Sequence, residues 1–317
     1  MTQQAVRKVT VMGAGAVGSF FGAMLARAGH SVTLIGRPAH VQAIQRDGLL
    51  LEMGGCVETV RLDVGIEASA VQDADVVLCC VKSGDTEAAA RAMAPHLGAN
   101  TLLMSLQNGV GNAEALARHV RCRVVPTAVY VAVALSGPGR VAHFGRGDLA
   151  IGALPGGTGS SVGEWPTLQT LVDLFASADV PVRIVADVAV ELWAKLLVNC
   201  AYNAISGLAQ MPYAALAAAP GIRELQRDVI EEVIAVAAAA GVSLSLPASL
   251  EAVAKIAAGM PGQMSSTAQD MARRKPSEID HLNGYIARRG AELGVPTPAN
   301  RALHALVKLV ESGYDAA

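Results

Sequence analysis

The first half of the chain alternates short apolar runs with segments of helical spacing. Four runs are rich in Val, Leu and Ile and nearly continuous in apolar character, as buried strands of a parallel sheet are. These runs are Lys8–Met12, Ser31–Ile35, Asp75–Val81 and Thr101–Leu106, and helical spacing fills Ala16–Ala28 and Asp85–His96. Strands that alternate with helices predict an α/β domain built on a parallel, doubly wound sheet. Further strands extending this sheet are predicted at Val124–Val133, Arg140–Phe144 and Asp148–Ala153.

The pattern changes near residues 184–187. A loop rich in Gly, Ser and Pro at Gly152–Pro166, a helix at Thr167–Ser177 and a strand at Val182–Val185 precede the change. Asp187 is suited to cap a following helix, and helical spacing continues from there. The predicted helices are Val188–Leu208, Ile222–Ala240, Ala248–Ala258, Ser277–Leu293 and Asn300–Glu311, with a kink at Met260–Gly262. The sequence therefore predicts an α/β domain over residues 1–185 and an all-helical domain over residues 186–317.

Composition narrows the class of protein. The 317 residues are 52% hydrophobic and 16% charged, so the chain can bury two cores. The formal net charge is −2 with no dense basic block, which argues against nucleic acid and membranes as partners. Met1–Val6 is polar and unlike a secretory signal, and we expect no apolar stretch of about 20 residues that would span a bilayer. A soluble, cytoplasmic protein is expected.

The cysteines point to no metal centre. They are odd in number and lack any CxxC or Cys/His spacing. The five residues, Cys56, Cys79, Cys80, Cys122 and Cys200, are expected to be small buried hydrophobic side chains of a protein in a reducing compartment.

A glycine motif follows the first predicted strand and opens the first helix. It consists of Gly13, Ala14, Gly15, Ala16, Val17 and Gly18. The first glycine permits a tight turn, the second lets a pyrophosphate approach the backbone, and the third lets the helix pack closely on the strand. The N-terminus of the helix then offers N–H groups and partial positive charge to the phosphates. Between a strand and a helix, this motif predicts a Rossmann-type dinucleotide-binding domain.

The end of the second strand indicates which dinucleotide is bound. An NAD-binding domain usually carries an acid there to hold the ribose 2′-hydroxyl, but this chain has Gly36 and Arg37. A guanidinium can form charge-assisted bonds to a 2′-phosphate, so NADP(H) is favoured, the alternative being a solvated surface arginine. Lys82 and Asn108 follow the third and fourth predicted strands, at the sheet edge where ligands bind.

Three polar residues form a stripe on the first helix of the second domain. Lys195, Asn199 and Asn203 are spaced i, i+4, i+8 and share one face of an otherwise apolar helix. Burying these groups is costly unless they line a wet cleft. There the amides would bind a carboxylate or hydroxyl, and the lysine would give a proton to a carbonyl oxygen as hydride arrives. The alternative is a solvated stripe on an amphipathic helix.

Farther along, Ser277 is predicted to cap a helix whose first turn holds Glu278 and Asp280. This ordinary structural role explains the acids, and physics alone assigns them no catalytic function.

The chain resembles the ketopantoate reductase (2-dehydropantoate 2-reductase) family along nearly its whole length. The matching positions are Gly13–Gly18, Arg37, Lys82, Gln107–Gly109, Leu192–Leu196, Asn199, Asn203, Ser265-Ser266, Gln269-Asp270, Ser277–Asp280, Leu282–Gly284, Gly294–Pro298 and Asn300. The resemblance implies NADPH-dependent reduction of 2-dehydropantoate to (R)-pantoate, a step toward pantothenate and coenzyme A.

The resemblance also implies roles for single residues. Lys195 looks like the general acid, and Asn199, Asn203 and Ser266 look like substrate ligands, in a cleft between the domains. Asn108 would lie between nicotinamide and substrate, Glu278 would sit at the cofactor and the lysine, and the backbone of Ala132 would meet the cofactor.

One departure leaves alternatives open. Tyr213 stands where family members often carry another substrate-binding Asn. The alternatives are a paralogue that reduces another 2-oxo acid, and a protein that senses NADP(H) without catalysis. The sequence leaves the oligomeric state open, a homodimer included.

Overall fold

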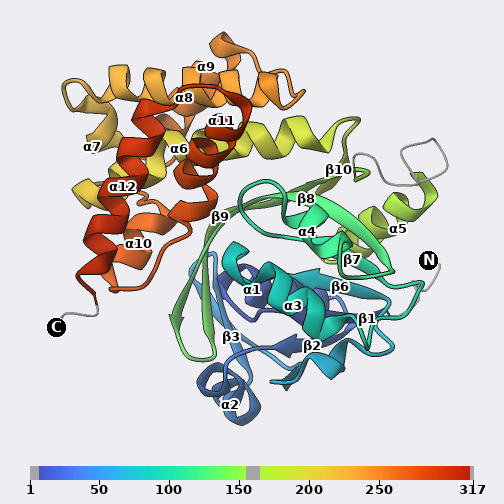
Figure 1. Cartoon of the computed structure of the whole chain (residues 1–317). Coiled ribbons are helices and arrows are strands. Elements are labelled where there is room, and N and C mark those ends of the chain that lie inside the picture. Colours follow the sequence, from blue (N-terminus) through green and yellow to red (C-terminus); the bar gives the residue numbers. More distant parts are fainter. Residues whose placement is uncertain (1–6, 155–164, 315–317) are drawn as a thin grey trace. The chain divides into compact units, whose positions relative to one another are not determined.

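A computed structural model of the protein describes residues 7–154 and 165–314. The predictions made for Met1–Val6 and for residues 155–164 of the loop lie outside these ranges. The chain divides into two compact units, Met1–Val188 and Ala189–Ala317, and each is described by itself (Figure 1).

The core of the first unit is a parallel sheet. Its strands are β1 (Lys8–Met12), β2 (Ser31–Ile35), β5 (Asp63–Gly65), β6 (Val76–Cys79), β7 (Leu102–Ser105) and β8 (Arg123–Gly137). They lie in the order β5-β2-β1-β6-β7-β8, and every neighbouring pair is parallel. The chain therefore winds outward in both directions from β1, which confirms the predicted doubly wound, Rossmann-type sheet.

Beyond β8 the sheet is mixed rather than parallel, although the further predicted strands do extend it. The long strand β8 folds back on β9 (Arg140–Ile151) as an antiparallel hairpin. Strand β9 also pairs in parallel with β3 (Leu49–Met53) and β10 (Val182–Ile184), and β3 pairs with β4 (Cys56–Val60) in the antiparallel sense. The two strands predicted at Arg140–Phe144 and Asp148–Ala153 are one strand with an irregular middle, where Gly145, Arg146 and Gly147 have positive φ.

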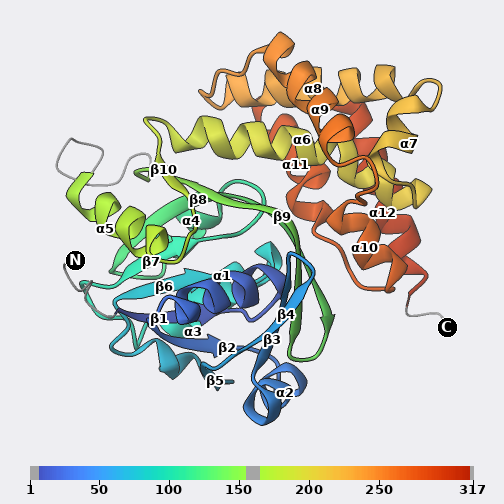
Figure 2. The same ribbon diagram turned by 180° about the vertical axis from the view of Figure 1, so that it is seen from behind.

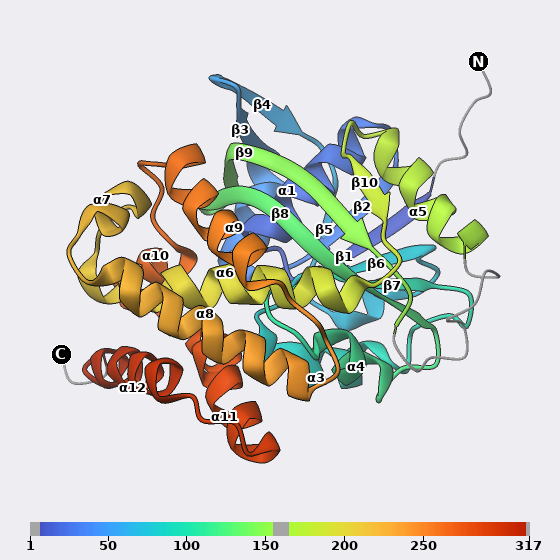
Figure 3. The same ribbon diagram turned by 90° about the horizontal axis from the view of Figure 1, so that it is seen from above.

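Helix α1 (Ala16–Arg27) is enclosed by the sheet. It packs against β1 and β2 on one side and against β8, β9 and β3 on the other, as Figures 2 and 3 show. All eight residues from Gly18 to Leu25 are buried. A helix that is apolar on every face is stable only in such surroundings, so the curved sheet and α1 form one core.

The opposite face of the parallel sheet carries a second core. It is covered by the short helix η1 (Ala68–Val71), α3 (Thr86–Met93) and α4 (Asn112–Ala117). Helices α2 (Pro38–Asp47) and α5 (Trp165–Ala176) and the short helix η2 (Ser83–Asp85) complete the described elements of this unit.

The regular elements among the described residues of the second unit are all helices. Its elements are α6 (Val188–Ala209), α7 (Tyr213–Ala218), α8 (Ile222–Ala239), α9 (Leu246–Gly259), α10 (Ser266–Ala272), η4 (Ile279–His281), α11 (Asn283–Leu293) and α12 (Pro298–Ser312). This confirms the all-helical prediction, although α7 and α10 were not expected. Helix α11 packs against α12 and α8, and α8 packs against α9.

The helix predicted to begin at Ser277 is wrong in its first turn. The chain forms the short helix η4, breaks at Leu282 (φ −112°, ψ −107°), and starts α11 at Asn283. The reason is that Ser277 and Asp280 bond to side chains of α12.

Helix α6 contradicts the expectation that no apolar stretch could span a membrane. By length and composition alone it qualifies, with a mean hydropathy of 1.2. Within the structure, 56% of that apolar window is buried, as in the core helix of a globular domain.

The cysteine prediction holds for three residues. Cys79, Cys122 and Cys200 are buried, and burial raises the pKa of Cys79 to about 12 and that of Cys122 to about 11. Cys80 is half-buried, and Cys56 is exposed on the β3–β4 hairpin, where burial was wrongly expected.

Candidate active site

The glycine motif forms the turn between β1 and α1. Gly13 has a φ of +107°, and a side chain there would place its Cβ 2.7 Å from the backbone nitrogen of Val81. Val81 follows β6, so Gly13 sits where the strand order reverses. In open α/β sheets this edge is where ligands bind.

The other two glycines have different surroundings. A Cβ at Gly18 would lie 2.2 Å from the carbonyl oxygen of Gly13 and 2.8 Å from Cγ1 of Val11, so only glycine lets α1 approach β1 this closely. A Cβ at Gly15 would meet nothing within 4 Å. Gly15 is the N-cap of α1 and has no side chain to bond the first N–H groups of the helix. The loop thus leaves an open approach to a helix N-terminus, which fits a pyrophosphate.

The end of β2 is tied to this loop. The backbone N–H groups of Gly13 and Ala14 both donate to the carbonyl of Ile35, at 3.0 and 2.8 Å. A Cβ at Gly36 would lie 2.8 Å from Cβ of Ala14, so this position also needs glycine. Arg37 follows as the N-cap of α2, with an exposed side chain that forms no ion pair with any described residue. Its guanidinium is available to a ligand beside the glycine loop.

The predicted site residues Lys82 and Asn108 lie in two loops that are hydrogen-bonded to each other. The carbonyl of Asn108 accepts hydrogen bonds from Oγ of Ser83 at 2.9 Å and from Nδ2 of Asn112 at 2.7 Å. Ser83 follows Lys82 directly, so one shared acceptor holds both loops.

A buried polar network supports these loops from below. Nε2 of Gln107 donates to the hydroxyl of Thr86 at 2.6 Å, and that hydroxyl lies 3.0 Å from Oδ1 of Asn112. Ser83, Thr86 and Asn112 were not singled out from the sequence. The available signal was that polar residues cluster just after two neighbouring strands.

Ala132 lies on β8, half-buried and opposite Gly145 of β9. The pairing register shifts on the next residue, so the backbone here departs from a regular ladder.

One residue of the polar stripe on α6, Asn203, contacts the start of α10. Lys195 and Asn199 are half-buried, and Asn203 is buried with its Nδ2 3.4 Å from Oγ of Ser266. The adjacent Ser265 caps α10 by accepting from the N–H of Ala268, and it donates to the carbonyl of Asn203. The structure therefore brings together two predicted substrate ligands, Asn203 and Ser266.

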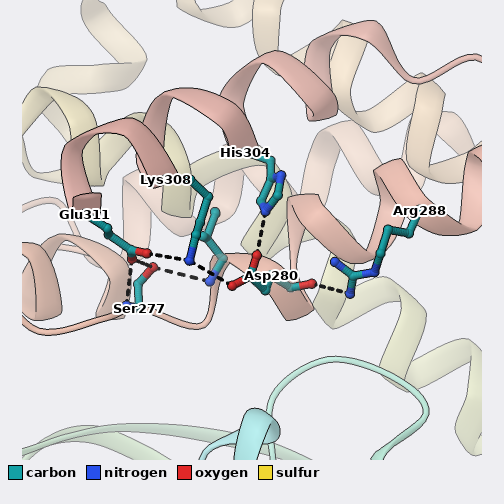
Figure 4. A network of polar contacts seen from close by, with 7 residues as sticks. Ser277, Asp280, Arg288, His304, Lys308 and Glu311 are labelled. Atoms are coloured by element: carbon teal, nitrogen blue, oxygen red, sulfur yellow. Dashed lines mark hydrogen bonds and ion pairs between the residues drawn. The ribbon is translucent and has the colours of Figure 1, made fainter.

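The segment that carries Glu278 is clamped to α12 on both sides of that residue (Figure 4). The N–H and hydroxyl of Ser277 donate to Oε1 of Glu311 at 2.7 and 2.5 Å. Asp280 contacts His304 at 2.7 Å and Lys308 at 3.0 Å. Burial opposes ionisation of Asp280, but the hydrogen bonds from His304 and Lys308 outweigh it and lower its pKa.

A second buried network ties α11 to α6. Nδ2 of Asn283 donates to the carbonyl of Cys200 at 3.1 Å and to Oδ1 of Asn300 at 3.0 Å. Glu232 accepts from Nδ2 of Asn300 at 2.7 Å. Cys200 lies between Asn199 and Asn203, so this network fixes the part of α6 that carries the amides.

Tyr213, the departure from the family pattern, packs against α6. Its ring is tilted on that of Tyr202 at 4.7 Å between centroids, and burial raises its pKa to about 12. Its hydroxyl is therefore protonated at neutral pH. Its backbone N–H donates to the carbonyl of Gln263, three residues before Ser266.

Comparison with known proteins identifies the family. Residues 9–156 match the model of Ketopantoate reductase PanE/ApbA, and residues 187–311 match that of its C-terminal domain. The chain belongs to the ketopantoate reductase family. This is an oxidoreductase family with a Rossmann-like domain, as the sequence indicated.

Individual relatives cover nearly the whole chain. A 2-dehydropantoate 2-reductase of Halobacterium salinarum is 34% identical over 96% of this chain and 99% of its own. A solved PanE/ApbA family ketopantoate reductase of Ralstonia eutropha is 51% identical with a TM-score of 0.89, over 97% and 99%. D-mandelate dehydrogenase, solved with NADH and anilino(oxo)acetate, is 25% identical with a TM-score of 0.90, again over 97% and 99%.

The surroundings of Gly15 and Gly18 predict that the same substitution affects stability at one position and cofactor binding at the other. Gly18→Ala should destabilise the protein by about 1–3 kcal/mol, because its methyl group meets backbone. Gly15→Ala should fold normally, yet bind a nicotinamide dinucleotide roughly tenfold more weakly, because the methyl fills the approach to the helix N-terminus. Urea unfolding without cofactor and fluorescence titration with cofactor separate the two effects. Normal binding by folded Gly15→Ala would contradict the placement of the phosphates.

Proposed function

We propose that the protein is an NADPH-dependent 2-dehydropantoate 2-reductase, which reduces ketopantoate to (R)-pantoate. The observation that carries this proposal is the polar face of α6. Lys195, Asn199 and Asn203 line one face of a largely apolar helix, and Asn203 lies beside Ser266. Relatives that match over nearly the whole chain are named for this reaction. The product would serve the synthesis of pantothenate and coenzyme A.

The residues of the first unit fit a dinucleotide. The open side of Gly15 and the N-terminus of α1 suit its pyrophosphate. Arg37, exposed beside the loop with no acid at the end of β2, suits the 2′-phosphate of NADPH. Lys82, Asn108 and the backbone of Ala132 are proposed as further cofactor contacts. Bound NADPH would supply the hydride that reduces the keto carbon.

The residues of the second unit supply the remaining chemistry. Lys195 donates a proton from its ammonium group to the keto oxygen as negative charge develops there. Asn199, Asn203 and Ser266 hold the carboxylate and hydroxyl groups of the substrate with hydrogen bonds from uncharged side chains. Glu278 orients the lysine and contacts the cofactor, and Asn108 contacts the substrate as well. The alternative of a cofactor sensor gives no reason for a lysine in register with two amides.

A second candidate is a reductase for another 2-oxo acid. Two observations favour it: Tyr213 replaces the Asn common in the family, and D-mandelate dehydrogenase has a similar fold over 97% of this chain. In either case we propose a soluble cytoplasmic enzyme, and a homodimer stays a prediction of the sequence.

Steady-state reduction of ketopantoate, beside a panel of 2-oxo acids that includes benzoylformate, tests the substrate. We expect the highest kcat/KM with ketopantoate. A higher value for an aromatic 2-oxo acid would establish the second candidate.

The role of Lys195 is tested by Lys195→Ala. Turnover should fall about 10²–10⁴-fold, the usual contribution of a positioned proton donor, while NADPH binding is kept. Lys255→Ala, which removes an exposed lysine paired with Glu251 on α9, is the matched control and should keep full activity. Undiminished turnover in Lys195→Ala would remove this lysine from the mechanism.

The choice of cofactor is tested by Arg37→Asp. The variant should lose about 1.5–3 kcal/mol of NADPH binding, the scale of a charged hydrogen bond, and much less of NADH binding. Dissociation constants for both cofactors, measured by fluorescence titration, give the comparison. Equal losses for the two would refute the phosphate assignment.

A further inference from the structure

His40, to which the sequence assigned no role, is a buried histidine in the first turn of α2. It is 8% exposed and contacts two other segments of the first unit. The backbone N–H of Gly139, in the turn between β8 and β9, donates to Nδ1 of His40 at 2.9 Å. Nε2 of His40 lies 3.2 Å from the hydroxyl of Ser19 on α1, and that hydroxyl lies 3.3 Å from the carbonyl oxygen of Ala14.

The available donors and acceptors determine the direction of each hydrogen bond in the series from Gly139 through His40 and Ser19 to Ala14. A backbone N–H can only donate, so Nδ1 of His40 carries no proton. In the neutral ring the proton is therefore on Nε2, which donates to the oxygen of Ser19. The hydroxyl proton of Ser19 is then free to be donated to the carbonyl of Ala14. Burial lowers the pKa of His40, which favours the neutral ring that this arrangement needs.

The chain of bonds links the glycine loop to the hairpin turn through α2. Ala14 belongs to the loop, and Ser19 is fully buried in α1. At the other end, Gly139 has a φ of +70°, and a Cβ there would lie 3.0 Å from Cβ of Ala43 on α2. Its carbonyl accepts from the N–H of Leu50 on β3. Helix α2 is therefore bonded at its first turn both to α1 and to the turn between β8 and β9.

That first turn includes the backbone of Arg37. The carbonyl of Arg37 accepts from the N–H groups of His40 at 3.0 Å and Val41 at 3.1 Å. Because His40 and Arg37 share one helical turn, whatever fixes His40 relative to the glycine loop also fixes the Cα of Arg37.

We propose that His40 is a positioning residue for cofactor selection. Together with the bonds from Gly13 and Ala14 to Ile35, the bonds from Ala14 through Ser19 and His40 to Gly139 set the distance between the glycine loop and Arg37. A dinucleotide whose pyrophosphate lies on the loop then presents its 2′-phosphate to the guanidinium. This inference rests on the proposed use of NADPH and on the role proposed for Arg37.

Two variants test the proposal. In His40→Asn the amide oxygen can replace Nδ1 as acceptor for Gly139, but the contact with Ser19 is lost. Ser19→Ala removes the hydroxyl and leaves the histidine in place. It breaks the same contact, so it tests the proposal even if His40→Asn folds poorly. In each, the ratio of kcat/KM for NADPH to that for NADH should fall about three- to tenfold, through a higher KM for NADPH, with kcat kept. A general loosening of the fold would instead lower kcat/KM for NADPH and for NADH together and leave their ratio unchanged.

The chain offers a closely matched control in His30. It is also 8% exposed, its Nδ1 accepts from the N–H of Arg7 at 3.2 Å, and its Nε2 lies 2.9 Å from the hydroxyl of Ser177. It precedes β2 and so lies at the opposite end of that strand from Arg37. His30→Asn makes the same chemical change, and it should leave the cofactor ratio unchanged.

Combination with Arg37→Ala separates this inference from the proposed function. If His40 acts through Arg37, the double variant Arg37→Ala/His40→Asn has the same ratio as Arg37→Ala alone. If Arg37→Ala lowers the ratio but His40→Asn and Ser19→Ala do not, the positioning role is wrong while NADPH use stands. If Arg37→Ala leaves the ratio unchanged, the phosphate assignment itself fails and the positioning role with it.

Discussion

Helix α1 approaches β1 at Gly18 so closely that the space holds no side chain, and the first unit is arranged around that contact. The close approach brings the N-terminus of α1 to the end of β1, beside Gly13 and the end of β6. It also draws the helix deep enough for β8 and β9 to close over its other side. The geometry suited to phosphate and the enclosure of the helix thus have one steric origin.

The second unit depends on buried polar groups. Asn283 and Asn300 are completely buried, and their Nδ2 groups donate to backbone carbonyls, to Oδ1 of Asn300 and to Glu232. Such groups are costly to bury unless they are bonded, so the network admits few alternative packings. Gly284 is part of the same constraint, because a Cβ there would lie 2.7 Å from the ring of His304 and displace it from Asp280.

The sequence predicted those features whose signal is local. Strands β1 and β2 were placed with their observed bounds, because they are continuous apolar runs next to an unmistakable glycine motif. The edge strand β4 is mostly exposed and β5 has three residues, so neither carries an apolar pattern. A local pattern also does not show whether a strand runs parallel or antiparallel to its neighbour. Gly145 and Gly147 interrupt the apolar pattern of β9, so the sequence predicted two strands where there is one.

The same distinction holds for the candidate site. The stripe Lys195, Asn199 and Asn203 is visible because one helix face has a fixed spacing. His40 was missed because its partners Ser19 and Gly139 are 21 and 99 residues away in the chain. Ser277 was misinterpreted for a like reason, since its partner Glu311 is 34 residues farther on.

The clamp between Ser277 and Glu311 bears on the order in which the protein is completed during synthesis. Helix α6 emerges from the ribosome well before α12, yet the segment bearing Glu278 acquires its fixed position only when Glu311 has been added. Until then the segment bearing Glu278 lacks its clamp while the apolar helix α6 is already made, and apolar surface exposed at such a stage is prone to aggregation. A nascent chain that stalls within α12 would hold a complete first unit and an unfinished second one. Loss of a few residues of α12 would therefore also leave the segment bearing Glu278 without its clamp.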